Sequence, residues 1–196
     1  MKKLHELVKF DSGSPQFRIT EVWDESAPVF TYYNQNDLEE DRSGIISKSS
    51  ERKQVRTLDA VHTLSAGDVI FSLITGKAAM VGDVHAGFLY TQNYIKMTPC
   101  PSLSKEFLVY LLNEDRSIRR QFAVGLQGST ILKYTLQQVK GLVLKKLPDL
   151  EQQRIIGAVY FNQLRLQALK NRAAEWETVI CLTSLAEVSE HDGRRI

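Results

Sequence analysis

The sequence predicts an α+β protein, in which a strand-rich domain with short helices is followed by one long C-terminal α-helix that forms a coiled coil. Two observations carry this prediction. Up to residue 147, short apolar runs alternate with Gly, Asp and Asn, as strands and turns do. Beyond Pro148 no proline follows, and apolar residues recur at spacings of three and four. We therefore expect a domain over residues 1–147, and a dimerising or docking helix with a polar tail over 148–196.

Within the first region, the clearest strand is the apolar run 69–74, which follows the turn Gly67-Asp68 and stops at Gly76. Shorter strands are predicted at 78–81, 87–91, 94–97 and 142–144. Ser104 can cap a helix that runs to Leu112 with an apolar stripe on one side. Residues 135–138 fit a capping box, which predicts one short helical turn that ends at Gly141.

The second region begins with Asp149 and Gln152, a pair suited to cap the long helix. A helix from Asp149 to about residue 185 would be on the order of 50 Å long. Its heptad seam consists of Ile155, Val159, Asn162, Leu166, Leu169, Ala173, Trp176 and Ile180. Such a seam predicts supercoiling against another helix, with Asn162 fixing the register and Trp176 as the main apolar anchor. The alternative is that the stripe lies across the chain's own domain.

Composition excludes several classes of protein. The 196 residues include 43% hydrophobic and 24% charged residues with a net charge of +2, so any nucleic-acid contact needs a local basic face. Cys100 and Cys181 lie in no CxxC pair, and we expect two reduced thiols. No apolar run is long enough for a signal peptide or a membrane span, so we expect a cytoplasmic protein. The four histidines have no metal-ligand spacing, and no metal is expected.

Most catalytic signatures are missing from the sequence. It contains no GxxxxGK[ST], GxGxxG or GxSxG motif, and no Asn/Asp-Pro-Pro-Tyr/Phe tetrapeptide of the amino-methyltransferases. One motif leaves an enzymatic alternative open. Glu51 and Lys53 form an ExK downstream of Asp37, the spacing of the Mg²⁺-dependent PD-(D/E)xK nucleases, although Asp37 lacks the preceding proline.

Basic and amide residues in loops or at element ends are the candidate DNA contacts. They occur in the polar loop 47–56, after the strand that stops at Gly76, after the helix over 104–112, and in the passage 127–133. The residues are Lys48, Arg52, Lys53, Arg56, Lys77, Arg116, Arg119, Arg120, Gln127 and Lys133. The loop 47–56 could equally be only solvated, and Ser129 and Thr130 could serve the local backbone rather than DNA.

Several segments, in order along the chain, resemble the specificity subunits of type I restriction-modification systems. An amphipathic segment runs into Ser12-Gly13-Ser14-Pro15, and 66–72 read Ala-Gly-Asp-Val-Ile-Phe-Ser. Residues 89–94 resemble the strand that follows in this family. Gln127-Gly128-Ser129-Thr130 and then Leu147-Pro148-Asp149-Leu150-Glu151-Gln152-Gln153 resemble its most recognisable passage, at the start of a conserved helix.

The resemblance implies a target-recognition domain without a catalytic centre, which binds double-stranded DNA for other subunits. Family members hold methyltransferase subunits that bring S-adenosylmethionine, and a restriction subunit that uses ATP, so no cofactor is expected in this chain, and Mg²⁺ would belong to those partners. Members carry two such domains, whose helices pack antiparallel. One domain and one helix would be a half-subunit, so a homodimer joined through the seam is expected to read an interrupted palindrome. An assembly module without DNA readout is the other alternative.

Overall fold

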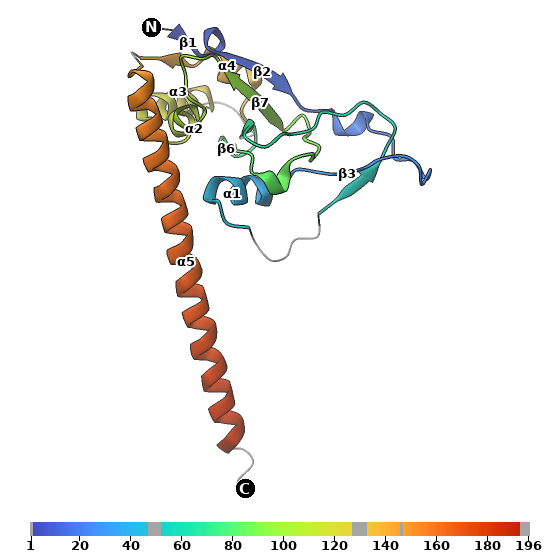
Figure 1. Ribbon diagram of the computed structural model, residues 1–196, viewed down its shortest axis with the longest axis vertical. Coiled ribbons are helices and arrows are strands. Elements are labelled where there is room, and N and C mark those ends of the chain that lie inside the picture. The colour runs from blue at the N-terminus through green and yellow to red at the C-terminus, as the bar shows by residue number, and fades with distance from the viewer. Residues whose placement is uncertain (1, 47–51, 127–132, 146, 193–196) are drawn as a thin grey trace.

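A computed structural model describes residues 2–46, 52–126, 133–145 and 147–192 (Figure 1). A mixed domain of short strands and helices lies beside one end of the long helix α5 (Leu150–Asp192), and the other end of α5 extends well past the domain. This architecture confirms the α+β prediction with its long C-terminal helix. Within the described residues, no helix is both long and apolar enough to cross a lipid bilayer.

The domain is organised around a four-stranded antiparallel sheet. Its order is β2 (Val8–Ser12), β7 (Tyr94–Pro99), β5 (Val69–Ser72) and β6 (Ala78–Met80). All four residues of β5 are buried, as expected for an apolar strand with a partner on each side. Because side chains alternate along a strand, Phe71 faces one side of the sheet and Ile70 the other.

Each face of the sheet has its own core. On the Phe71 face pack α2 (Lys105–Glu114), α3 (Arg116–Leu126) and α4 (Leu136–Gly141), with Phe107, Leu108 and Phe122 among the buried contacts. On the Ile70 face, Leu38 of α1 (Gln35–Ser43) packs with Tyr90 and other residues from irregular segments. The sheet is therefore buried on both faces over its central strands.

Smaller elements complete the domain. β1 (Lys2–Lys3) pairs with β8 (Val143–Leu144), and β3 (Val29–Thr31) pairs with β4 (Gln54–Arg56) in an arm that points away from α5 (Figure 1). Single turns of 3₁₀ helix occur at η1 (Leu4–Glu6), η2 (Gln16–Arg18) and η3 (Asp83–His85).

The predicted strands at 78–81, 94–97 and 142–144 and the helices at 104–112 and 135–141 are confirmed, with bounds that differ by at most two residues. The strand at 69–74 is shorter than predicted. Ser72 Oγ accepts hydrogen bonds from the amides of Ile74 and Thr75, and this turn ends β5 at Ser72. The predicted strand at 87–91 is wrong, because Leu89 makes only isolated bridges, one to Tyr32 and one to Thr63.

α5 is anchored to the domain at its first turns. Asp149 Oδ1 accepts a hydrogen bond from the Gln152 amide, which confirms the predicted cap. The buried Gln153 side chain accepts a hydrogen bond from the Ser104 amide, at the start of α2, and donates to the Ser102 and Pro148 carbonyls. At Gly157 the two helices come so close that an added Cβ would lie 2.4 Å from Glu106 Cβ. Further along, the Asn113 side chain donates a hydrogen bond from Nδ2 to the Tyr160 hydroxyl at 3.1 Å.

Candidate nucleic-acid interface

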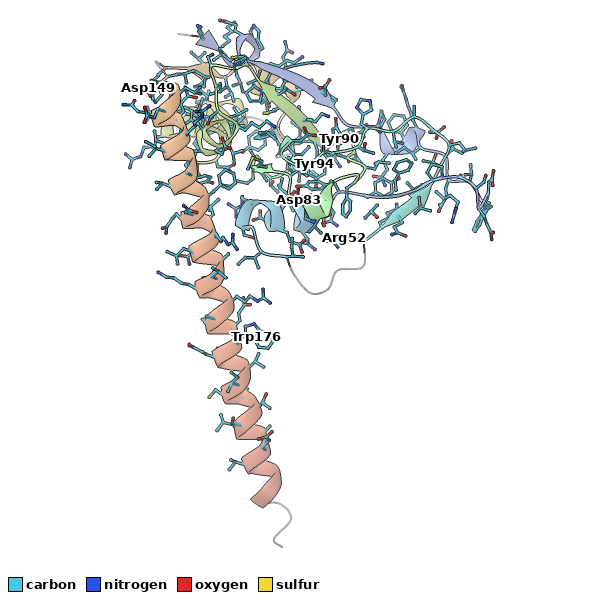
Figure 2. All side chains as sticks on the ribbon, in the orientation of Figure 1. Arg52, Asp83, Tyr90, Tyr94, Asp149 and Trp176 are labelled. Atoms are coloured by element: carbon cyan, nitrogen blue, oxygen red, sulfur yellow. The ribbon has the colours of Figure 1, made fainter. Side chains whose placement is uncertain are left out.

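The ten candidate DNA contacts fall into distinct groups in space. Lys48 and Gln127 lie outside the described residues. Arg56 is the last residue of β4, and Arg52 and Lys53 lie immediately before this strand, at the arm formed by β3 and β4. Figure 2 labels Arg52 there. The other five lie near α3 or near the turn after β5.

Two of the arm residues use their guanidinium groups within the chain. Arg52 Nε lies 2.8 Å from Asp37 Oδ1, and its Nη2 lies 3.0 Å from Glu40 Oε2. Arg56 Nη1 donates hydrogen bonds to the carbonyls of Glu25 and Ala27. Lys53, by contrast, is exposed, with Nζ 5.3 Å from the centre of the Tyr32 ring. In this group Lys53 is the residue best placed to reach a phosphate.

Around Tyr134 the structure brings together three candidates that are far apart in the sequence. Lys77 and Arg119 line a cavity of about 220 Å³, which Tyr134 and Phe122 also line. Lys133, the neighbour of Tyr134 in the chain, donates a hydrogen bond from Nζ to Asn93 Oδ1. The Tyr134 amide donates to the Leu73 carbonyl, so this segment is held against the end of β5.

α3 supplies the remaining basic residues. Arg116, Arg119 and Arg120 are exposed on this helix, whereas Ile118 and Phe122 are buried in the core. Arg119 has one distant carboxylate neighbour, Glu114 Oε2 at 3.9 Å. Because the net charge is only +2, any nucleic-acid contact would need a local basic face. The exposed guanidinium groups beside the Tyr134 cavity form such a face.

Behind Arg52 lies a buried charged cluster that the sequence did not predict. Asp37, Glu40 and Asp41 of α1 surround His85 of η3, whose Nδ1 is 2.7 Å from Asp41 Oδ1. His85 Nε2 is 3.2 Å from Glu40 Oε2 and 3.4 Å from Asp37 Oδ1. The only available sequence signal is that positions 37, 40 and 41 share one side of a helix.

Hydrogen bonds and charge set the protonation of His85 in this cluster. Burial by itself would lower its pKa, but the hydrogen bond with Asp41 and the charges of Asp41, Asp37 and Glu40 outweigh burial and raise the pKa above the ordinary value of 6.5. The guanidinium of Arg52 and the proton that the raised pKa keeps on His85 both compensate the negative charge of carboxylates that have almost no contact with water.

The same cluster bears on metal binding and on the nuclease alternative. Ligand atoms of Asp37, Glu40 and His85 lie within 4.8 Å of one another, a spacing compatible with a metal ion. However, Arg52 Nη2 already contacts Glu40 and lies 3.3 Å from His85 Nε2. Asp37 is fully buried and Glu51 lies outside the described residues. A nuclease carboxylate must reach a metal beside the attacked phosphate, and Asp37 has no surface through which to do so.

α5 presents two different faces. Toward the domain lie residues that are buried or half-buried, namely Gln153, Ile156, Gly157, Tyr160, Phe161, Leu164, Ala168 and Arg172. At 3.6 residues per turn, the seam residues from Ile155 to Ala173 fall on the opposite side of the helix. The large apolar side chains of the seam are 45% to 63% exposed. For the residues from Ile155 to Ala173, the alternative that the seam lies across its own domain is therefore wrong.

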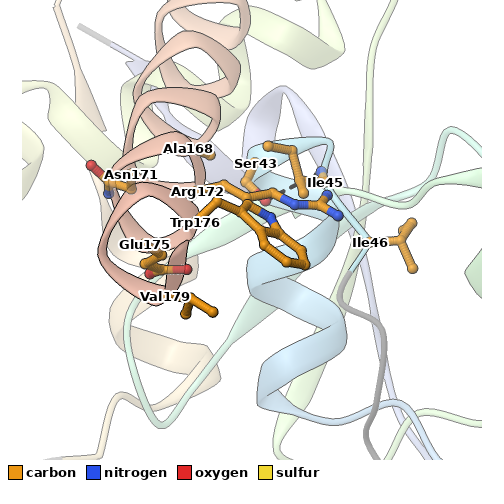
Figure 3. Close-up of a pocket in the computed structure, with 9 residues that line it drawn as sticks. All are labelled: Ser43, Ile45, Ile46, Ala168, Asn171, Arg172, Glu175, Trp176 and Val179. Carbon is orange, nitrogen blue, oxygen red and sulfur yellow. Dashed lines mark hydrogen bonds between the residues drawn. The ribbon is translucent and has the colours of Figure 1, made fainter. Parts of the chain in front are cut away.

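Trp176 departs from the rest of the seam. Its ring lies in a groove of about 510 Å³ between α5 and the segment after α1, with Ile45, Ile46 and Val179 as apolar neighbours (Figure 3). Trp176 is thus at the margin of the seam, turned toward the domain. In a straight helix, a 3.5-residue repeat drifts around the surface, and by residue 176 the drift has carried this position sideways.

The whole fold is similar to two solved structures. The crystal structure of the HsdS subunit from Thermoanaerobacter tengcongensis is 18% identical with a TM-score of 0.56, over 88% of this chain and 39% of that chain. A structure from a study of complex assembly and conformational transition of the type I R-M system is 20% identical with a TM-score of 0.58, over 93% of this chain and 42% of that chain. This chain spans about two fifths of the length of either one. No protein-family model and no curated protein matches the sequence.

Proposed function

We propose that this chain recognises DNA on behalf of other proteins, as a non-catalytic specificity subunit of a type I restriction-modification system. The observation that carries the proposal is the fold: a recognition-type domain joined to a long helix, similar over about nine tenths of the chain to two structures of type I systems. One of the motifs that resemble specificity subunits, the Pro-x-Leu-Glu-Gln passage, begins α5, as the resemblance implies.

The local basic face supports DNA as the ligand. Lys77, Arg119 and Lys133 around Tyr134, together with Arg116 and Arg120, offer cations to phosphates, which supply most of the affinity in such complexes. Guanidinium and amide groups on loops would supply base discrimination. Arg52 and Arg56 are not assigned to these contacts, because both are partly buried and their guanidinium groups bind oxygens of the chain itself. Lys133, by contrast, is exposed, and its ammonium group has hydrogens beyond the one that it donates to Asn93 Oδ1.

The exposed seam supports assembly through α5. Apolar side chains in a row on the far face of a helix need a partner helix, and a second copy of this chain presents the same row. In this proposal the paired helices also carry methyltransferase subunits, which bring S-adenosylmethionine, and a restriction subunit, which uses ATP and Mg²⁺. The chain itself then needs no cofactor.

Selection of duplexes from a random-sequence pool tests the recognition role. The purified chain at low salt, alone and with a type I methyltransferase subunit, is expected to enrich a defined sequence. Lys77→Gln combined with Arg119→Gln should weaken binding, whereas Lys170→Gln, an exposed lysine of α5, should not. A wild-type chain that enriches no sequence in either condition contradicts the proposal. Assembly with the methyltransferase in the absence of any DNA preference would instead support the interaction-module alternative.

A further inference from the structure

A second basic cavity lies on a part of the domain to which no role has been given. It has a volume of about 530 Å³ and is lined by residues of β1, η1, β2 and α4. These are Lys3, His5, Val8, Phe10, Gln137, Lys140 and Gly141. In Figure 1 these elements lie at the end of the molecule farthest from the C-terminus of α5. Two lysines, a histidine and an amide therefore meet here although they come from segments about 130 residues apart.

No carboxylate is among the described residues that line this cavity. Glu6 follows His5 in the chain, but its Oε1 accepts a hydrogen bond from the Lys3 backbone amide at 3.1 Å. Asp11 follows Phe10, but alternation along β2 places its side chain on the other face of the strand. The cations of the cavity thus lack a carboxylate counter-charge within its lining, and an anion would supply one.

The cavity is held in shape by the elements below it. The Leu4 amide donates a hydrogen bond to the Leu142 carbonyl at 2.8 Å, and Leu4 and Val139 are fully buried. His5 Nδ1 lies 3.1 Å from the Lys140 carbonyl oxygen, and because a carbonyl only accepts, Nδ1 carries the hydrogen and the ring is oriented. Lys140 Nζ lies 5.8 Å from the centre of the Phe10 ring. Groups positioned before binding lose little entropy when a ligand arrives.

Two further lysines lie near the elements that line the cavity. β1 pairs with β8, so Lys2 lies opposite Leu144, next to the exposed Lys145. Two lysines around one cavity suit adjacent phosphates of a polymer, and the apolar side chains of Val8 and Phe10 suit the sugar between phosphates. The cavity gives no set of donors and acceptors matched to one base edge, so we expect it to contact the backbone and not to read sequence.

We propose that this cavity of Lys3, His5, Gln137 and Lys140 binds the phosphodiester backbone of the DNA, as a second contact separate from the basic face around Tyr134. The inference rests on the proposed function for the identity of the polymer. The contact is sequence-independent and would position the duplex across the domain end.

Salt titrations of DNA binding by the full chain test this inference. The double variant Lys3→Gln/Lys140→Gln should weaken binding to fluorescein-labelled duplexes of unrelated sequence by the same factor, about tenfold or more at low salt. The slope of log K against log salt concentration should become less negative by roughly 0.9 for each phosphate that the variant no longer binds, hence by nearly two. The matched control is Lys9→Gln/Lys170→Gln, which removes the same charge from exposed positions outside the cavity. Equal melting temperatures of the two double variants would show that both are folded.

The outcomes separate the two proposals. Unchanged affinity and slope in the cavity variant, with sequence-selective binding intact, would overturn the inference and leave the proposed function standing. A loss confined to one DNA sequence would also overturn it, because the cavity would then be reading bases. A wild-type chain that binds no duplex at low salt overturns both. Equal losses of affinity in the cavity variant and the control would show that only the net charge of the chain matters, and they would overturn the inference as well.

Discussion

At the scale of single residues, the cluster behind Arg52 joins three parts of the chain into one unit. The carboxylates of Asp37 and Glu40 are 0% and 5% exposed, and a guanidinium and an imidazole from two other segments neutralise them. A buried carboxylate that loses its partner is costly, because it must either keep an uncompensated charge or bind a proton. The cluster is therefore where side-chain chemistry contributes most directly to the stability of the α1 side of the domain.

Replacing Arg52 tests this contribution. Arg52→Met removes the charge but keeps much of the side chain's volume, and it should lower the free energy of unfolding by about 3 kcal/mol, as for other broken buried ion pairs. Arg42→Met is the matched control. Its partner Glu39, which lies on α1 like Asp37 and Glu40, is 46% exposed, so the change should cost at most about 1 kcal/mol. Urea unfolding followed by circular dichroism measures both, and equal losses of stability would contradict a special role of Arg52.

The raised pKa of His85 predicts how stability depends on pH. A raised pKa means that the folded chain binds the proton more tightly than the unfolded chain. The protonated ring therefore contributes stability that is fully present below about pH 6.5 and is lost as the pH rises through the folded-state pKa. Unfolding free energies measured from pH 6 upward should fall for the wild type, and His85→Gln should flatten this part of the curve. His62→Gln, at an exposed position, should keep the wild-type slope.

At the scale of elements, α5 is both a part of the domain and a surface for something else. Its first turns pack on α2, where Gly157 allows the backbones to approach and Gln153 and Tyr160 bond to α2 or its preceding turn. The opposite face carries the exposed seam. One helix can serve both purposes because its two faces are half a turn apart.

The close approach at Gly157 predicts a result opposite to helix propensity. Alanine favours a helix over glycine by about 1 kcal/mol, yet a Cβ at this position would lie 2.4 Å from Glu106 Cβ and 2.9 Å from its backbone carbon. Gly157→Ala should therefore destabilise the chain by about 1–3 kcal/mol through overpacking. Gly141→Ala, where an added Cβ meets nothing within 4 Å, should be neutral or stabilising. Thermal unfolding compares them, and a stabilised Gly157→Ala variant would refute the close contact.

The seam predicts an oligomer that depends on the outer face of α5. Leu166→Asp combined with Leu169→Asp places charges in the row of exposed apolar side chains, and it should weaken self-association on the order of 100-fold or more. Gln163→Asp changes an exposed polar residue outside the seam and should leave association unchanged. Sedimentation velocity over a range of concentrations measures the effect. If the double variant associates as the wild type does, the contact lies elsewhere, with the groove around Trp176 as the next surface to test.

At the scale of the whole molecule, the proposed function predicts that the long helix and the domain together determine the form of the DNA target. A two-fold pair of chains would place two identical domains at a fixed separation, so the selected duplexes should contain inverted half-sites with a constant spacer. The Leu166→Asp/Leu169→Asp variant should then select a single half-site and bind it more weakly, because the second contact no longer adds to the first. Selection of the same spaced inverted repeat by this variant would show that the seam does not set the spacing.

The sequence by itself determined the features that depend on local patterns. Periodicity and capping chemistry were sufficient to predict elements whose residues depend on neighbours within a few positions. These are the apolar run of β5, the helix caps Ser104, Thr135 and Asp149, and the row of seam residues. α1 was not predicted, although Asn34 and Asp37 cap each other at its start. The prediction of a strand at 87–91 was wrong because, in the part of the chain that the structure describes, this segment makes only isolated bridges and has no regular partner strand.

Only the tertiary structure decided which charged side chains are available. Arg52 and Lys53 are adjacent and equally basic in the sequence, yet one neutralises Asp37 and Glu40 and the other is exposed. Lys3, His5 and Lys140 line one cavity because β1 pairs with β8 and η1 packs on α4, which no local pattern shows. The seam was visible in the sequence, but its position opposite the domain was not. Periodicity shows which residues share one face of a helix, whereas packing decides which face of the helix lies against the domain.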